Sequence, residues 1–203
     1  MILSKKMNKK ENLEKLKEKC LFCTKCPLFC TRMNVVFSDG NENSSMMLVG
    51  EAPGANEDMQ GLPFVGRSGK LLREFFANEG LVAERDFYIS NIIKCRPPDN
   101  RLPSKKEKEA CIDYLLKQIE IISPQIIVCV GATSVKEILK TKEPISKIRG
   151  QWFEGFGAKI MPVFHPSYLL RNPIEKEGSP KDLMRQDIKE IKRMKEFIQG
   201  NNF

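Results

Sequence analysis

The chain has 203 residues, enough for one compact domain with a sizeable core and too few for two ordinary ones. Lys and Arg outnumber Asp and Glu by 34 to 26, and the net charge of +8 favours a polyanionic partner. No apolar stretch is long enough for a signal-peptide core or a membrane span, so we expect a cytosolic protein without a membrane partner.

The N-terminal segment carries much of the basic excess and is expected to be helical. Its lysines are Lys5, Lys6, Lys9, Lys10, Lys15, Lys17 and Lys19. Such a segment can bind nucleic acid, but a solvated lysine-rich helix face of a heat-adapted protein explains it equally well. We expect residues 1–203 to form a single domain, with this basic helix and the following cysteine loop, about residues 8–32, packed on it.

Seven cysteines in a cytosolic chain favour metal or cluster ligation over a disulfide framework. Four of them crowd together as Cys20, Cys23, Cys26 and Cys30. Their spacing matches the bacterial ferredoxin run, although the proline, Pro27, follows the third cysteine rather than the fourth. Cys129 lies in an apolar strand and is expected in the core, whereas the local pattern around Cys111 leaves its role open.

Strands and helices alternate along the rest of the chain. Short apolar strands are expected over residues 46–49, 87–90, 126–130 and 160–164. Helices are expected over residues 69–78, over 104–122 behind a capping box, over 132–139, and from Ser179-Pro180 onward. Alternation of this kind predicts an α/β fold, a three-layer α/β/α sandwich with a central four-stranded parallel sheet.

Three polar segments follow predicted strands: residues 50–58, 91–98 and 165–171. Because ligands bind beyond the carboxyl ends of parallel strands, we expect these segments to meet on one rim. The last one begins with His165, the only histidine. A lone histidine is more often structural, and a Gly-Pro loop is weak by itself. Together, a neutral imidazole donor, a Gly-Pro loop whose backbone can lie close to a ligand and an apolar wedge are typical of a site that takes a base out of DNA.

Five motifs in order resemble the family 4, iron-sulfur-containing uracil-DNA glycosylases of thermophilic bacteria and archaea. They are Cys23-x2-Cys26-Pro27-Leu28, Gly50-Glu51-Ala52-Pro53-Gly54-x2-Glu57-Asp58, Gly61-x-Pro63-Phe64-Val65-Gly66-Arg67, Asn91-x3-Cys95-Arg96-Pro97-Pro98 and His165-Pro166-Ser167-Tyr168-Leu169-Leu170. The resemblance runs from about Cys20 to the last helix. It implies a monofunctional hydrolase that flips deoxyuridine, cleaves the N-glycosidic bond and starts base excision repair.

The resemblance also implies roles in binding the base. Phe64 corresponds to the ring that stacks on uracil, and Asn91 to the amide that reads the uracil edge. Ala52 stands where other uracil glycosylases carry Asp or Asn, which leaves Glu51 and Glu57 as candidates for positioning the water. A loop-capping role is the alternative for each of these two acids.

Catalysis and DNA contact are implied by the segment after the last predicted strand. His165 corresponds to the electrostatic catalyst that donates a hydrogen bond to uracil O2. Leu169 and Leu170 resemble the wedge that fills the vacated base stack. Arg171 and Arg96 are candidates for holding the flanking phosphates.

The resemblance implies a [4Fe-4S] cluster whose ligands are Cys23, Cys26, Cys95 and Cys111. Cys20 and Cys30 depart from the family pattern as two additional thiols, and Ser38 stands where the family usually has glycine. A related branch that captures uracil covalently uses a histidine in an inserted loop, which residues 98–107 lack. The alternatives are a ferredoxin-like electron carrier or a non-catalytic DNA-binding protein. We expect a monomer, with a sliding clamp as a candidate partner.

Overall fold

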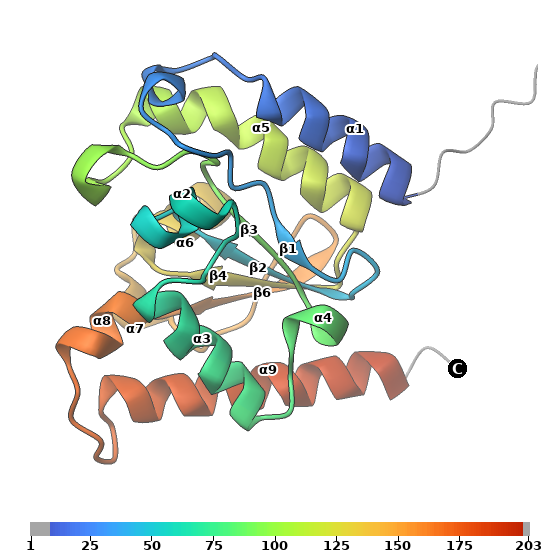
Figure 1. Cartoon of the computed structure of the whole chain (residues 1–203). Coiled ribbons are helices and arrows are strands. Elements are labelled where there is room, and N and C mark those ends of the chain that lie inside the picture. The colour runs from blue at the N-terminus through green and yellow to red at the C-terminus, as the bar shows by residue number, and fades with distance from the viewer. Residues whose placement is uncertain (1–8, 201–203) are drawn as a thin grey trace, which may run out of the picture.

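The computed structural model describes residues 9–200, so Lys5 and Lys6 of the basic segment lie outside the described residues. A single sheet runs through the middle of the molecule, and helices cover both of its faces (Figure 1). Its strands are β1 (Asp39–Gly40), β2 (Met46–Gly50), β3 (Tyr88–Asn91), β4 (Ile126–Val130), β5 (Phe153–Gly155) and β6 (Ala158–Val163). The predicted α/β/α sandwich is confirmed.

The sheet order is β1-β3-β2-β4-β6-β5, and the four middle strands are parallel. These are the four predicted strands, each displaced by two residues or fewer. The two edge strands, β1 and β5, are antiparallel to their neighbours and were not predicted. They have two and three residues, and neither is fully buried, so neither carries the apolar run that reveals the others.

Two layers of helices enclose the sheet. In Figure 1, α1 (Lys9–Leu21) and α5 (Lys105–Ile122) lie above it, and α3 (Arg67–Asn78) and α9 (Pro180–Gly200) lie below. The other α-helices are α2 (Ala55–Gln60), α4 (Ala83–Asp86), α6 (Ala132–Leu139), α7 (Ile145–Ile148) and α8 (Pro166–Arg171), and two 3-10 turns are η1 (Pro27–Cys30) and η2 (Pro98–Asn100). Within residues 9–200 no helix combines the length and apolarity that crossing a membrane requires.

Side chains of the buried strands alternate between two apolar cores. Met47 and Val49 of β2 join the core between the sheet and helices α1 and α5, whereas Met46 and Leu48 join the core between the sheet and helices α3 and α9. This is the period-2 geometry of a strand covered on both faces. Cys129 is fully buried in β4, as predicted.

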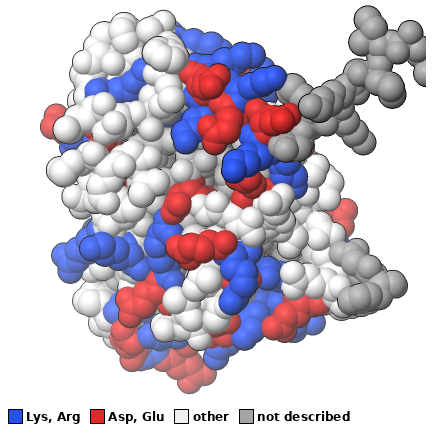
Figure 2. Space-filling view, turned by 45° about the vertical axis from the view of Figure 1, so that its right-hand side comes forward, with Lys and Arg blue, Asp and Glu red and all other residues white. Residues whose placement is uncertain are grey.

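The N-terminal helix α1 buries Leu13, Leu16 and Cys20 and packs against α5. Its lysines lie on the outer side, apart from Lys9, whose Nζ donates to the carbonyl of Ile122 at 2.8 Å. Figure 2, turned toward the α1 side, shows Lys and Arg intermixed with Asp and Glu. The mixture of signs favours the interpretation of α1 as a solvated helix face.

Candidate active site

Loops from the carboxyl ends of the parallel strands surround one cavity of about 380 Å³. The predicted residues that line it are Glu51, Ala52, Glu57, Phe64, Asn91, His165 and Arg171. The three segments predicted to share a rim therefore do so. Arg96, Leu169 and Leu170 do not line the cavity.

His165 precedes the short helix α8 and acts as its N-cap. Its Nδ1 accepts a hydrogen bond from the backbone N–H of Ser167 at 3.2 Å and lies 2.7 Å from the Ser167 hydroxyl oxygen. Because a neutral imidazole has one donor nitrogen, an accepting Nδ1 leaves the proton on Nε2. Burial, followed by the positive charge of Arg171, lowers the pKa of His165 to about 4. The ring is therefore a neutral donor at physiological pH.

Gly131, at the end of β4, allows His165 to lie close to the sheet. A Cβ atom at this position would lie 2.9 Å from the His165 Cβ and 3.1 Å from its Cδ2. The glycine also has a φ of +92°, where a side chain would strain the backbone. The position of the imidazole thus depends on a residue that follows a neighbouring strand.

Asn91 is the last residue of β3 and is only 2 % exposed. It pairs with Gly50 of β2, where a Cβ would collide with Asn91 Oδ1 and with the Phe64 ring. Within residues 9–200, no hydrogen bond engages the Asn91 side-chain amide. The amide keeps both a donor and an acceptor for a ligand in the cavity.

Phe64 lies beside Asn91 in a left-handed backbone conformation, with a φ of 56°. A bulky residue rarely adopts this conformation unless its surroundings impose it. Arg73 of α3 supplies part of that restraint, because its guanidinium donates to the carbonyls of Phe64 at 3.1 Å and Pro63 at 3.0 Å. Arg73 is itself held by an ion pair with Asp39. Contacts within the protein therefore hold the backbone that carries the ring.

Glu57 is buried and braces two loops. Its carboxylate accepts backbone hydrogen bonds from Gly54 at 3.1 Å, Val65 at 2.9 Å and Gly66 at 2.7 Å. Three backbone donors use most of the acceptor capacity of a carboxylate. The structure therefore favours the loop-capping alternative over water positioning for Glu57.

Glu51 is held differently, by one partner on another loop. One of its carboxylate oxygens accepts a hydrogen bond from the Thr133 hydroxyl, and within residues 9–200 no hydrogen bond engages the other oxygen. Glu51 lines the cavity and is half-buried. Its second oxygen remains open to a water or a ligand.

The two leucines after His165 differ in burial. Leu169 is fully buried in the core that α3 and α9 cover, so the expectation that it forms part of the wedge is wrong. The cause is the helical turn of α8, which directs Leu169 inward and leaves Leu170 half-buried. Arg171 is exposed at the cavity. Arg96 does not line the cavity, but its Nε donates to Oδ1 of Asn100, which does, at 2.8 Å.

A second, small cavity is lined by Cys20, Cys23, Cys26, Cys95 and Cys111. Cys30 is exposed and lies outside it. Arg32 ties this region together by donating to Cys95 Sγ at 3.2 Å and to the carbonyl of Cys23 at 3.0 Å. Burial raises the pKa of Cys20 to about 12 and that of Cys111 to about 11.

The cysteine cavity fits a group that takes thiolate ligands. Within residues 9–200, no three His, Cys, Asp or Glu side chains are close enough to hold a single metal ion. Five thiols from separate segments of the chain line this one cavity, and they form the soft donor set that iron-sulfur clusters take. Cys111, which the helix pattern left open, is therefore both a buried core residue and a candidate ligand.

Several residues of the active-site cavity carried no predicted role. They include Ser68, Asn100, Arg101 and Ser167, and Thr133 acts through Glu51. Ser167 could have been found from its place two residues after His165. Thr133 and Gly131 follow β4, the one parallel strand whose carboxyl end was given no functional loop. Arg101 is fixed by a bidentate ion pair with Glu107, which no sequence motif announces.

Comparisons with known proteins agree with this geometry. The profile of the uracil DNA glycosylase superfamily matches residues 37–189. The chain is 44% identical over 192 residues to the type-4 uracil-DNA glycosylase of Thermotoga maritima, covering 94% of this chain and 96% of that protein. It is 40% identical to the type-4 uracil-DNA glycosylase of Archaeoglobus fulgidus, covering 86% and 92%. A type-5 uracil-DNA glycosylase of Pyrobaculum aerophilum is more distant, at 28% identity over 149 residues. The chain therefore belongs to the type-4 uracil-DNA glycosylases.

Proposed function

We propose that this protein flips deoxyuridine out of DNA and hydrolyses its N-glycosidic bond, which releases uracil and leaves an abasic site for base excision repair. The observation that carries the proposal is the neutral His165 donor in one cavity with Asn91 and Phe64. A ferredoxin-like carrier would have no use for this cavity, and the matched profile spans the α/β fold rather than the N-terminal cysteines.

Recognition of the base is assigned to Phe64 and Asn91. Stacking of uracil on the Phe64 ring contributes about 1 to 3 kcal/mol. The free Asn91 amide can donate to uracil O4 and accept from N3–H at the same time. Cytosine has the opposite polarity at these two atoms, so an amide held in one orientation rejects it.

The chemical step is assigned to His165. Breaking the glycosidic bond leaves negative charge on uracil and positive charge on the sugar. A donor at uracil O2 stabilises charge that develops only in the transition state. The Nε2–H of His165 suits this task, because the ring needs no reorganisation and carries no charge that substrate binding would have to desolvate.

Glu51 is assigned to position the attacking water. Thr133 holds one of its oxygens, which leaves the other to accept a hydrogen bond from water. Glu57 is assigned to hold the loops that carry Phe64 and Ala52 instead. Ala52 lines the cavity without a side-chain base.

DNA contact is assigned to the rim outside the cavity. Leu170 is the remaining candidate for the wedge, since Leu169 belongs to the core. Arg171 and Arg96 are assigned to the phosphates that flank the flipped nucleotide. A sliding-clamp partner, a monomeric state and the single domain over residues 1–203 stay predictions.

A [4Fe-4S] cluster held by Cys23, Cys26, Cys95 and Cys111 is proposed for the cysteine cavity. When bound, the cluster supplies a cross-link between the N-terminal loop, the loop after β3 and α5. Cys20 lines the same cavity and is the alternative N-terminal ligand, whereas the exposed Cys30 is not.

The function is tested by incubating the protein with a duplex that holds one uracil and with the same duplex holding thymine. Strand scission at the uracil position after alkali treatment is the expected result, with the thymine duplex left intact. Asn91→Ala should lose excision through lost recognition of the uracil edge. Absence of abasic sites in the uracil duplex would contradict the proposal.

A further inference from the structure

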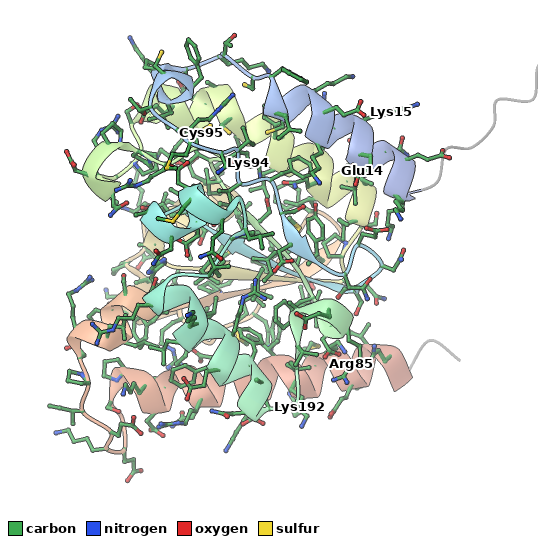
Figure 3. The ribbon with its side chains drawn as sticks, in the orientation of Figure 1. Glu14, Lys15, Arg85, Lys94, Cys95 and Lys192 are labelled. Carbon is green, nitrogen blue, oxygen red and sulfur yellow. The ribbon has the colours of Figure 1, made fainter. Side chains whose placement is uncertain are left out.

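Lys94 is a fully buried lysine that directly precedes Cys95. It lines the cysteine cavity, and Figure 3 shows it beside Cys95 in the interior, between α5 and the sheet. Removing an ammonium group from water costs several kcal/mol unless other groups compensate for it. The uracil-binding roles above make no use of this side chain, so the burial of Lys94 needs its own explanation.

The Lys94 ammonium has a complete set of hydrogen-bond acceptors. Its Nζ donates to Ser90 Oγ at 2.5 Å, to Gln118 Oε1 at 2.6 Å and to the carbonyl of Asn91 at 2.8 Å. The Gln118 orientation is fixed, since its Nε2 donates to the carbonyl of Phe37 at 3.2 Å. Three acceptors match the three N–H groups of an ammonium. All three acceptors are uncharged. They satisfy the hydrogen bonds of the ammonium group but do not neutralise its positive charge.

The groups that can balance this charge are thiols. Within residues 9–200, Lys94 forms no ion pair with a carboxylate. The groups facing it that can become anionic are Cys111, Cys20 and Cys95. The Phe37 ring adds a weak attraction from 6.0 Å. A buried cation surrounded by thiols suggests a site built for thiolates.

We propose that Lys94 is the internal counter-cation of the thiolate centre in the cysteine cavity. This inference rests on the cluster assigned under the proposed function. Four thiolates around an iron-sulfur core leave a net negative charge, and that charge would otherwise be buried without compensation. Lys94 and the centre then stabilise each other, and each is costly to bury alone.

The reduction potential of the bound cluster tests the charge directly. Loss of a nearby positive charge makes an anionic centre harder to reduce. Lys94→Met and Lys94→Gln should both move the midpoint potential to a more negative value. Ser90→Ala is the matched control, because it removes one hydrogen bond from the same buried network and keeps the charge. A wild-type potential in both uncharged variants, or an equal shift in Ser90→Ala, would overturn the proposal.

Thermal unfolding of the iron-loaded and iron-free proteins gives a second test. Lys94→Met should lower the melting temperature of the loaded protein but raise that of the iron-free protein, where wild-type Lys94 is a buried charge without its partner. A purely structural lysine would give the same decrease in both forms and would refute the proposal. If the variant cannot retain iron, the iron-free comparison alone decides. Colourless, iron-free wild-type protein would contradict the proposed cluster itself, independently of Lys94.

Discussion

At the level of single residues, the chemistry of this site depends on the state of one imidazole. Ser167 fixes the tautomer of His165 through its backbone N–H, and burial keeps the ring neutral. A cationic imidazole would be a stronger donor but would have to be desolvated in the cavity. A preorganised neutral donor avoids that penalty and acts only as charge develops on uracil.

Replacement of His165 tests this role. His165→Ala should slow single-turnover excision by about 10²-fold or more, because one preorganised donor to the developing anion is lost. Affinity for uracil-containing duplex should stay nearly unchanged, since the donor acts in the transition state. Full single-turnover activity in the variant would rule out the role. Retention of the cluster colour is the control for folding, since His165 lines a different cavity from the cysteines.

The pH dependence of excision should follow the lowered pKa of His165. Since the folded pKa is about 4, against an ordinary value of 6.5, the ring stays neutral between these values in the folded protein. Loss of rate caused by His165 protonation should therefore appear near pH 4 rather than near pH 6.5. A single-turnover excision rate that falls with a midpoint at a pH of about 6.5 would contradict this prediction.

The same shift affects stability in a defined direction. Between pH 6.5 and about 4 the unfolded chain binds a proton at His165 that the folded protein does not. The contribution of His165 to the free energy of unfolding is therefore present above pH 6.5 and lost as the pH falls toward 4. The melting temperature of wild-type protein should decrease more over this interval than that of His165→Ala.

At the level of elements, the cysteine loop is fastened to the sheet by contacts distant in sequence. Arg32 reaches Cys95 and the carbonyl of Cys23, and the Tyr114 hydroxyl donates to the carbonyl of Lys19 at 3.2 Å. The loop itself has little regular structure beyond η1. Ligation of a cluster across it would add the restraint that a larger core normally supplies.

Individual cysteine replacements should separate ligands from bystanders. Cys95→Ala and Cys111→Ala should yield colourless protein, because each removes a ligand from a different element. Cys30→Ala should remain brown, with absorption near roughly 400 nm, since Cys30 is exposed outside the cavity. Cys20→Ala should also stay brown if Cys23 and Cys26 form the N-terminal pair. Stoichiometric zinc in place of iron would refute the cluster.

At the level of the whole molecule, the chain carries a net charge of +8, which attracts DNA. The face shown in Figure 2 intersperses both signs, and Arg171 adds a cation at the rim of the cavity. Contacts of this kind act on phosphates of any sequence and release counterions when they form.

DNA affinity should therefore decrease steeply as salt increases. Arg171→Ala should weaken binding to uracil-containing and undamaged duplexes by a similar factor and reduce the salt slope by about one. Fluorescence anisotropy over a salt series measures both quantities. Affinity independent of salt, or a loss confined to the uracil duplex, would contradict this electrostatic account.

The sequence by itself determined the parallel core of the fold and most of the site. The four central strands are apolar on both faces, and the carboxyl ends of parallel strands share a rim, so the convergence of Glu51, Asn91 and His165 followed from local patterns. The motifs that resemble type-4 uracil-DNA glycosylases added roles that composition could not. The edge strands escaped because two or three half-exposed residues have no apolar period.

Only the tertiary structure decided which way side chains face and which atoms they contact. Leu169 and Leu170 are identical residues side by side, and only the turn of α8 makes one core and leaves the other half-buried. Glu51 and Glu57 belong to the same motif. Backbone N–H groups of another loop donate to the Glu57 carboxylate, whereas the Thr133 hydroxyl donates to that of Glu51. These outcomes depend on contacts between segments far apart in the chain, which local periodicity does not encode.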